Sequence, residues 1–190
     1  LYKILAVTQM VLDELEKRKQ LFADYNGDYD TYLRESGQSL PRWVIVINAF
    51  DVFNETNGKL VAVLDSVFRD CIKYGISFVC TTTMASALRG RRIQFFGKRI
   101  CLHMPDDYDY RKLTESRKGL IPHNNFGRCV APINDEEMCE FQTAFITKRE
   151  EINILVRKNA DNFLKYYTTR AKQLPKIPET VDSKHLEAYI

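Results

Sequence analysis

Apolar residues recur with helical spacing in two parts of the first half of the chain. The first series consists of Leu5, Leu12, Leu15 and Phe22, with charged residues such as Glu14 and Arg18 between them. This spacing predicts one amphipathic helix over about the first 25 residues. The Asn-Gly-Asp sequence at 26–28 ends it, and a short segment follows at 29–33.

The second helical series follows the Asn-Gly pair at 57–58. Its apolar positions are Leu60, Leu64, Val67, Phe68, Cys71 and Ile72. These positions share one face of the predicted helix. Gly75 stands where a helix C-cap favours glycine and ends the predicted helix.

Two short apolar runs have the length of strands. Residues 44–47 are a continuous run of β-branched residues, which predicts a strand buried on both faces of a parallel sheet. Residues 76–80 form the next buried strand. A strand, a helix and a strand with short connections predict a parallel crossover. The predicted fold class is therefore α/β, a mainly parallel sheet flanked by helices, either doubly wound or RecA-like.

The second half of the chain contains shorter predicted elements. These are a helical or irregular segment (84–97), a third strand (99–104), a short helix (106–116), an antiparallel strand pair (127–131 and 138–146) and a final helix (150–172). Pro175 and Pro178 then indicate a linker. We expect one domain over residues 1–174 and a linker over 175–190 toward a following module.

Composition narrows the class of protein. The 190 residues are 45% hydrophobic and 28% charged, as in one globular domain, and no run approaches the roughly 18 apolar residues of a membrane helix. The net charge of +3 is too balanced to indicate a nucleic-acid binder. The five cysteines include no C-x-x-C pair, so we expect reduced thiols and no metal site. Because the chain begins at Leu1 without an initiating Met, we expect a piece of a longer protein.

The strand at 44–47 ends at two residues that lack acidic groups. In open α/β sheets the ligand crevice lies outside the carboxyl ends of the strands. P-loop ATPases place an aspartate for Mg²⁺ there, and often a glutamate for water. This chain has Asn48 and Ala49, an amide and a methyl group. The pattern predicts a nucleotide site that has lost part of its chemistry.

An ordered series of short sequences carries a family resemblance. The series consists of residues 15–22, Leu40-Pro41 before a buried strand, Ile47-Asn-Ala-Phe50, Tyr74-Gly75-Ile76 and the strand leading into Thr81-Thr-Thr83. Over residues 1–146 the chain resembles the FtsK/SpoIIIE ATPases. Within these it is similar to a C-terminal ATPase domain, the second of the tandem set, in EssC/YukB-type proteins. Those proteins are membrane-anchored motors of the type VII (Esx, WXG100) secretion systems of Gram-positive bacteria.

The resemblance implies a partial RecA-like P-loop fold and a role for four residues. Asn48 and Ala49 occupy the positions of the catalytic Asp-Glu pair, which argues against bound Mg²⁺ and implies weak or absent hydrolysis. Thr83 falls at the polar end of the sensor strand, and Arg111 is a candidate for contact with a neighbouring domain's nucleotide. The implied cofactor is ATP. The phosphate loop G-x-x-x-x-G-K-[ST] does not occur in these residues, and the family places it upstream of the first helix.

The resemblance also implies partners and a location. The partners are adjacent ATPase domains of the same chain, Esx/WXG100 substrate proteins and other membrane components of the secretion system, with the full-length protein as an oligomer. The location is a cytoplasmic domain of a cell-membrane protein that does not itself insert into the membrane. The role is an ATPase-like domain in which nucleotide binding is regulatory or structural.

Two alternative functions remain open at this point. A DNA translocase of the FtsK type would need an acidic pair at 48 and 49 and a pronounced basic face. A nucleotide-free module would only bind substrates or neighbouring domains. The one basic cluster, Arg89, Arg91, Arg92, Lys98 and Arg99, is either a solvated or interdomain face or a substrate-facing loop. Arg111 has a local alternative too, an ion pair with Asp107.

Overall fold

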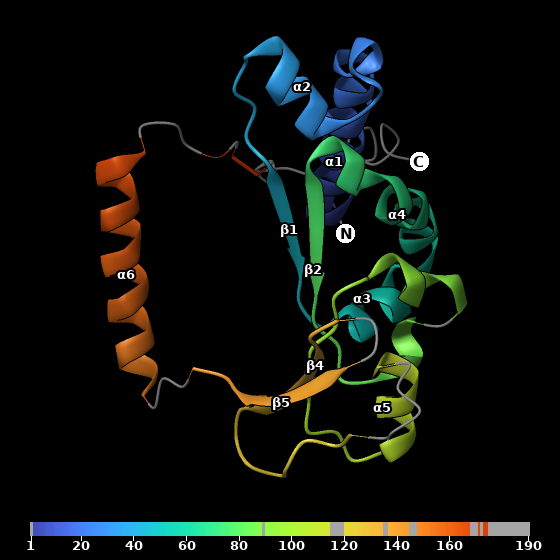
Figure 1. Ribbon diagram of the computed structural model, residues 1–190, viewed down its shortest axis with the longest axis vertical. Coiled ribbons are helices and arrows are strands. Elements are labelled where there is room, and N and C mark those ends of the chain that lie inside the picture. The colour runs from blue at the N-terminus through green and yellow to red at the C-terminus, as the bar shows by residue number, and fades with distance from the viewer. Residues whose placement is uncertain are drawn as a thin grey trace. The chain divides into compact units, whose positions relative to one another are not determined.

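The computed structural model describes residues 2–88, 90–114, 120–134, 137–144, 148–167, 171 and 173–174 (Figure 1). Contacts between residues divide the chain into two units, Leu1–Gly97 with Leu174–Ile190 and Lys98–Gln173. None of the helices in the described part of the chain is both long and apolar enough to span a bilayer.

The first unit begins with the predicted amphipathic helix. Helix α1 spans Tyr2–Leu21, a 3₁₀ turn follows at Ala23–Tyr25, and helix α2 spans Tyr29–Ser36. The side chain of Asp28 caps α2 by accepting a hydrogen bond from the Thr31 amide at 2.8 Å, which satisfies one of the free N–H groups of the first turn. Phe22, Tyr29 and Tyr32 form a buried aromatic core between these elements.

The predicted crossover forms the centre of the first unit. Strand β1 is Trp43–Ile47, helix α3 is Phe50–Thr56, helix α4 is Gly58–Asp70 and strand β2 is Ile76–Cys80. The two strands pair in parallel from Trp43 with Ile76 to Ile47 with Cys80, as expected. Helix α3 was not expected, because its seven residues are too few to show a helical period.

The described residues of the first unit cover one face of its sheet and leave the other face open. Helix α4 buries Val61, Leu64, Val67 and Phe68, and Phe68 packs edge-on against Phe78 of β2 at 4.7 Å between ring centroids. On β1, however, Val44 and Val46 are 64% and 65% exposed. The prediction that β1 is buried on both faces is therefore wrong within this unit, because alternate β1 side chains point to a face that no described element of the same unit covers.

The predicted apolar face of α4 is buried or half-buried from Leu60 to Cys71 and ends before Ile72. Cys71 is buried, but Ile72 is exposed. The α-helix ends at Asp70, and a 3₁₀ turn over Cys71–Tyr74 carries the chain to Gly75, which adopts a left-handed conformation (φ +69°). A 3₁₀ turn has three residues per turn instead of 3.6, so Ile72 leaves the face that the helical period assigned to it.

A buried arginine joins α1 to the amino ends of both strands. Arg18 is 1% exposed and pairs with Glu14 at 2.8 Å. Its guanidinium also donates to the carbonyl oxygens of Tyr74 at 2.9 Å, Gly75 at 3.3 Å and Pro41 at 2.8 Å. Because Pro41 precedes β1 and Gly75 precedes β2, this one side chain holds the entry to both strands.

The second unit contains a small antiparallel sheet. Strand β3 is Cys101–Leu102, helix α5 is Asp107–Thr114, strand β4 is Arg128–Pro132 and strand β5 is Met138–Gln142. The strand order is β3-β4-β5, and the hairpin of β4 and β5 was predicted. The third strand is shorter than expected, because only Cys101 and Leu102 have a partner, and that partner, β4, runs antiparallel. The parallel part of the described chain is thus β1 and β2 alone.

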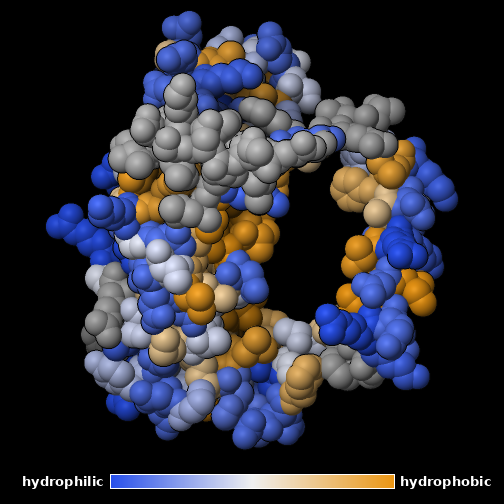
Figure 2. Space-filling view, turned by 180° about the vertical axis from the view of Figure 1, so that it is seen from behind, coloured by the Kyte–Doolittle hydropathy of each residue, from blue (hydrophilic) through white to orange (hydrophobic). Residues whose placement is uncertain are grey.

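Helix α6, Arg149–Tyr166, is the predicted final helix and is shorter than the predicted 150–172. All of its described side chains are exposed. Its apolar residues Ile152, Leu155, Val156, Phe163 and Tyr166 recur at helical spacing, and Figure 2 shows hydrophobic side chains among polar ones along this helix. The predicted linker, 175–190, lies outside the described residues.

Candidate functional site at the carboxyl ends of the parallel strands

The backbone turns sharply where β1 ends. Ala49 adopts a left-handed conformation (φ 53°, ψ 60°), which is uncommon for a residue with a β-carbon, and α3 begins at the next residue. The ladder between the strands extends beyond β2, since the Thr81 amide donates to the Ile47 carbonyl at 3.0 Å and the Phe50 amide donates to the Thr81 carbonyl at 2.7 Å. Asn48 and Ala49 are thereby held against Thr81.

The Thr81 hydroxyl orients the side chain of Asn48. It accepts a hydrogen bond from the Ala49 amide at 3.0 Å and donates its own hydrogen to Asn48 Oδ1 at 2.6 Å. The carboxamide oxygen is therefore engaged by Thr81. The amide nitrogen, Nδ2, has no partner among the described residues and belongs to an exposed side chain, so Asn48 offers hydrogen-bond donors to solvent.

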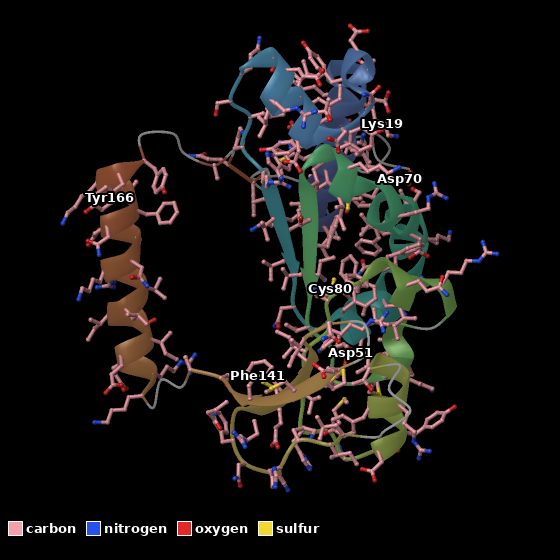
Figure 3. All side chains as sticks on the ribbon, in the orientation of Figure 1. Lys19, Asp51, Asp70, Cys80, Phe141 and Tyr166 are labelled. Atoms are coloured by element: carbon pink, nitrogen blue, oxygen red, sulfur yellow. The ribbon has the colours of Figure 1, made fainter. Side chains whose placement is uncertain are left out.

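Asp51 is a site residue that sequence reasoning missed. It lies in the first turn of α3, close to the carboxyl end of β2 at Cys80 (Figure 3), and is 6% exposed. Its Oδ2 accepts hydrogen bonds from the Thr83 hydroxyl and from the Thr83 amide, the latter at 3.4 Å. The usable signal was an acidic residue two positions beyond Ala49, but the expected acidic pair directed attention to the two positions directly after the strand.

The charge of Asp51 is stabilised locally. The hydrogen bond from the Thr83 side chain is the main influence that lowers the pKa of Asp51, and burial opposes it by disfavouring the charged form. The other carboxylate oxygen, Oδ1, is buried and has no hydrogen-bond partner among the described residues. Thr83, in turn, has committed its hydroxyl hydrogen to Asp51, so it retains only acceptor capacity toward any ligand.

Arg92, one arginine of the basic cluster, packs next to this site through contacts with Asp65 and Phe50. Arg92 forms a bidentate pair with Asp65, with Nε to Oδ1 at 2.6 Å and Nη2 to Oδ2 at 2.9 Å. The guanidinium of Arg92 also lies 5.9 Å from the ring centroid of Phe50, the residue that follows Ala49. Arg92 is therefore a packing residue. Arg91 and Lys98 are exposed, Arg99 donates to the Leu113 carbonyl at 2.9 Å, and Arg89 lies outside the described residues.

Arg111 belongs to the second unit, whereas Asn48, Ala49 and Thr83 belong to the first. It lies on α5 and is exposed. No ion pair joins Arg111 to Asp107, although both residues are described. The local alternative for Arg111 is thus not formed in this structure.

One cleft of the first unit lies away from Asn48 and Asp51. A cleft of about 450 Å³ between α1 and α4 is lined by charged residues that include Lys19 and Asp70, near the amino ends of the strands (Figure 3). Ligands of open α/β sheets bind at the carboxyl ends of the strands, so this cleft lies away from the edge where a ligand is expected. In the described part of the chain, no three or more His, Cys, Asp and Glu side chains are grouped as metal ligands.

Comparisons with known proteins agree with this architecture. The chain superposes over 97% of its length on EssC (ATPases 2 and 3) from Geobacillus thermodenitrificans, with a TM-score of 0.77 and 21% identity, and covers 36% of that structure. EccC (ATPases 2 and 3) from Thermomonospora curvata, in complex with a signal sequence peptide, gives a TM-score of 0.75 and 20% identity over 97% of this chain and 35% of that one. The fold is that of an EssC-type ATPase domain.

Sequence comparison also finds an EssC protein. Type VII secretion system protein EssC of Staphylococcus aureus (strain MRSA252) is 21% identical over 98% of this chain. The chain spans 13% of the length of that EssC protein. No family model matches the chain. The predicted resemblance to EssC-type ATPase domains and the predicted P-loop ATPase fold are confirmed.

Proposed function

We propose that this chain is an ATPase-like domain of a type VII secretion motor in which nucleotide binding is regulatory or structural. The observation that carries the proposal is the pair Asn48-Ala49 at the carboxyl end of β1 in an EssC-type fold. In open α/β sheets the ligand crevice lies outside the carboxyl ends of the strands, which supports a nucleotide site at this edge. Asn48 and Ala49, the two residues directly after β1, lack the carboxylates that would bind Mg²⁺ and position water. The proposed domain extends over residues 1–174, and the proposed linker over 175–190.

The proposed ligand is ATP. Asn48 fits one requirement of a phosphate contact, since its exposed amide nitrogen is a free donor. Thr83 fits less well than the sequence indicated, because its hydroxyl hydrogen is already donated to Asp51. Arg111 is the proposed contact to a neighbouring domain's nucleotide, because its exposed guanidinium, which has no ion pair within the described part of the chain, can bind phosphate bidentately.

Hydrolysis tests the catalytic part of the proposal. General-base or water-positioning groups contribute about 10² to 10⁴ in rate, so the loss of both carboxylates should leave very slow turnover. We expect phosphate release by the purified intact domain to be far below about 1 s⁻¹, the lower end of ordinary ATPase and kinase rates. Turnover at or above that rate would show that another group has replaced the acidic pair.

The proposed partners are adjacent ATPase domains of the same protein, Esx/WXG100 substrates and other membrane components of the secretion system. The proposed setting is the cytoplasmic side of a membrane-anchored oligomer. The EccC structure with a signal sequence peptide supports substrate binding by domains of this kind. Nucleic acid is not a proposed partner, since net charge is only +3 and Arg92 of the basic cluster is paired with Asp65.

Secretion by the full-length protein tests the proposed role of Arg111. Arg111→Ala should change the free energy of unfolding by no more than about 0.5 kcal/mol, as is usual for exposed residues, and should reduce substrate export. Arg34→Ala, which removes an exposed arginine of the first unit, is the matched control and should leave export unchanged. Normal export by the Arg111→Ala protein at equal expression would exclude a trans-acting role for this residue.

The nucleotide-free module is the competing function. It is favoured by one observation, the engagement of both strand-end acceptors by threonine hydroxyls. Equilibrium dialysis with ATP separates the two functions. Saturable binding that Asn48→Ala weakens about tenfold, as the loss of a hydrogen bond to a charged group would do, supports nucleotide binding. Export without any measurable ATP binding supports the nucleotide-free module.

A further inference from the structure

Members of this fold class use acceptor oxygens at the carboxyl ends of the parallel strands to hold Mg²⁺. A hard divalent cation needs oxygen ligands with accessible lone pairs, above all carboxylates. The question for this chain is which oxygens at the strand ends remain accessible. Four side chains supply them: Asn48, Asp51, Thr81 and Thr83.

The oxygens of Asn48 and Asp51 are poor ligands for a cation, because one belongs to a neutral amide and the other two belong to a carboxylate that is hydrogen-bonded or buried. Asn48 Oδ1 accepts the Thr81 hydroxyl at 2.6 Å, and Asp51 Oδ2 accepts both the hydroxyl and the amide of Thr83. Asp51 Oδ1 is fully buried, so it cannot join a hydrated ion. The Asp51 carboxylate is thus buried and hydrogen-bonded to Thr83, while the exposed Asn48 presents N–H groups.

The two threonines therefore have a definite role. Thr81 donates to Asn48 Oδ1, which leaves the amide nitrogen as the group that exposed Asn48 offers, and Thr83 donates to Asp51 Oδ2. Each hydroxyl oxygen keeps only the acceptor capacity of a neutral group, which is weaker toward a divalent cation than that of a carboxylate. We propose that Thr81 and Thr83 lock these oxygens inward, so that the strand ends exclude a divalent cation and offer the Asn48 amide to a nucleotide phosphate that binds without Mg²⁺. The phosphate part of this inference rests on the proposed function, and the exclusion of the cation does not.

Two measurements on the intact domain, which joins the chain to the upstream phosphate-loop segment that the family resemblance implies, test the two parts separately. Mn²⁺ titration followed by electron paramagnetic resonance reports the cation alone. For the wild type we expect a dissociation constant for Mn²⁺ of about 1 mM or weaker. This is the weak end of the affinities of extracellular Ca²⁺ modules. Asn48→Asp places an exposed carboxylate at the strand end and should tighten Mn²⁺ binding at least about tenfold. Asn124→Asp adds the same charge in an exposed loop of the second unit and should not.

ATP binding in Mg²⁺ and in EDTA reports the phosphate part. We expect the two dissociation constants to agree within about threefold, and Asn48→Ala to weaken binding about equally in both, since one hydrogen bond is lost. A wild-type Mn²⁺ site tighter than about 0.1 mM that Asn48→Ala or Asp51→Ala removes overturns the lock. A loss of ATP affinity above about tenfold in EDTA also overturns it. No ATP binding in either buffer overturns the proposed function and the phosphate part, while the Mn²⁺ result still decides whether the cation is excluded.

Discussion

Arg18 offers a direct test of how the site is held in place. The side chain is 1% exposed, pairs with Glu14 and donates to three backbone carbonyls that precede or begin the two parallel strands. Arg18→Ala leaves those carbonyls and the largely buried Glu14 carboxylate without their donor. Removal of one partner of a buried ion pair costs about 3–5 kcal/mol. That is a large part of the roughly 5–15 kcal/mol that stabilises a domain.

The measurement is urea unfolding followed by circular dichroism. With a slope of about 2 kcal/mol per molar urea, a loss of 3 kcal/mol lowers the midpoint by about 1.5 M. Arg18→Lys keeps the charge but loses the planar fork, so its midpoint should fall between those of the wild type and the alanine variant. It remains measurable if Arg18→Ala does not fold.

Arg34→Ala is the matched control, because Arg34 is exposed and its only ion pair, with Glu35, is exposed as well. Such a pair contributes about 0–1 kcal/mol. A loss below about 1 kcal/mol for Arg18→Ala, equal to that of the control, would refute the reasoning. It would mean that water replaces the guanidinium at the carbonyls without cost.

Three further predictions concern the strand ends and the thiols. Ala49→Gly should stabilise the fold by up to about 1 kcal/mol, since glycine relieves the left-handed strain of about 1–2 kcal/mol and costs part of that in chain entropy. Burial raises the pKa of Cys80 to about 12 and of Cys101 to about 11, so both thiols should react slowly with a thiol reagent at pH 8 until urea is added. The Thr83 hydrogen bond lowers the pKa of Asp51 in the folded protein. The contribution of this hydrogen bond to the free energy of unfolding should therefore be complete above pH 3.8 and disappear as the pH falls through the lowered pKa.

Each of these has a control and a contrary result. Gly58→Ala is the control for Ala49→Gly: Gly58 has an ordinary helical backbone in α4, so the opposite exchange, glycine to alanine, should stabilise the fold there. Destabilisation by Ala49→Gly would show that the methyl group of Ala49 contributes to packing. Rapid native labelling of both thiols would contradict their strand positions. Thr83→Val should be less stable than the wild type at pH 6 and approach it in acid, and a difference that does not change with pH would separate Thr83 from the charge of Asp51.

The sequence by itself determined the elements whose pattern is local. The spacing of Leu15 and Phe22 gives α1, and the β-branched run at 44–47 gives β1, because helical and strand periods are written in neighbouring residues. The departures at Asn48 and Ala49 were also visible, since a strand of known direction points to its own carboxyl end. The order of these segments was enough to predict an EssC-type ATPase domain.

Only the tertiary structure decided which charges are buried and which hydrophobic faces are open. Arg18 is one of several charged residues between apolar positions of α1, and its burial depends on carbonyls 23 to 57 residues away in the chain. Asp51 became a site residue through Thr83, 32 residues further on. The open face of β1 at Val44 and Val46 follows from which elements pack on the sheet. A residue's own neighbours in sequence carry no record of such distant partners, because burial is a property of the assembled fold.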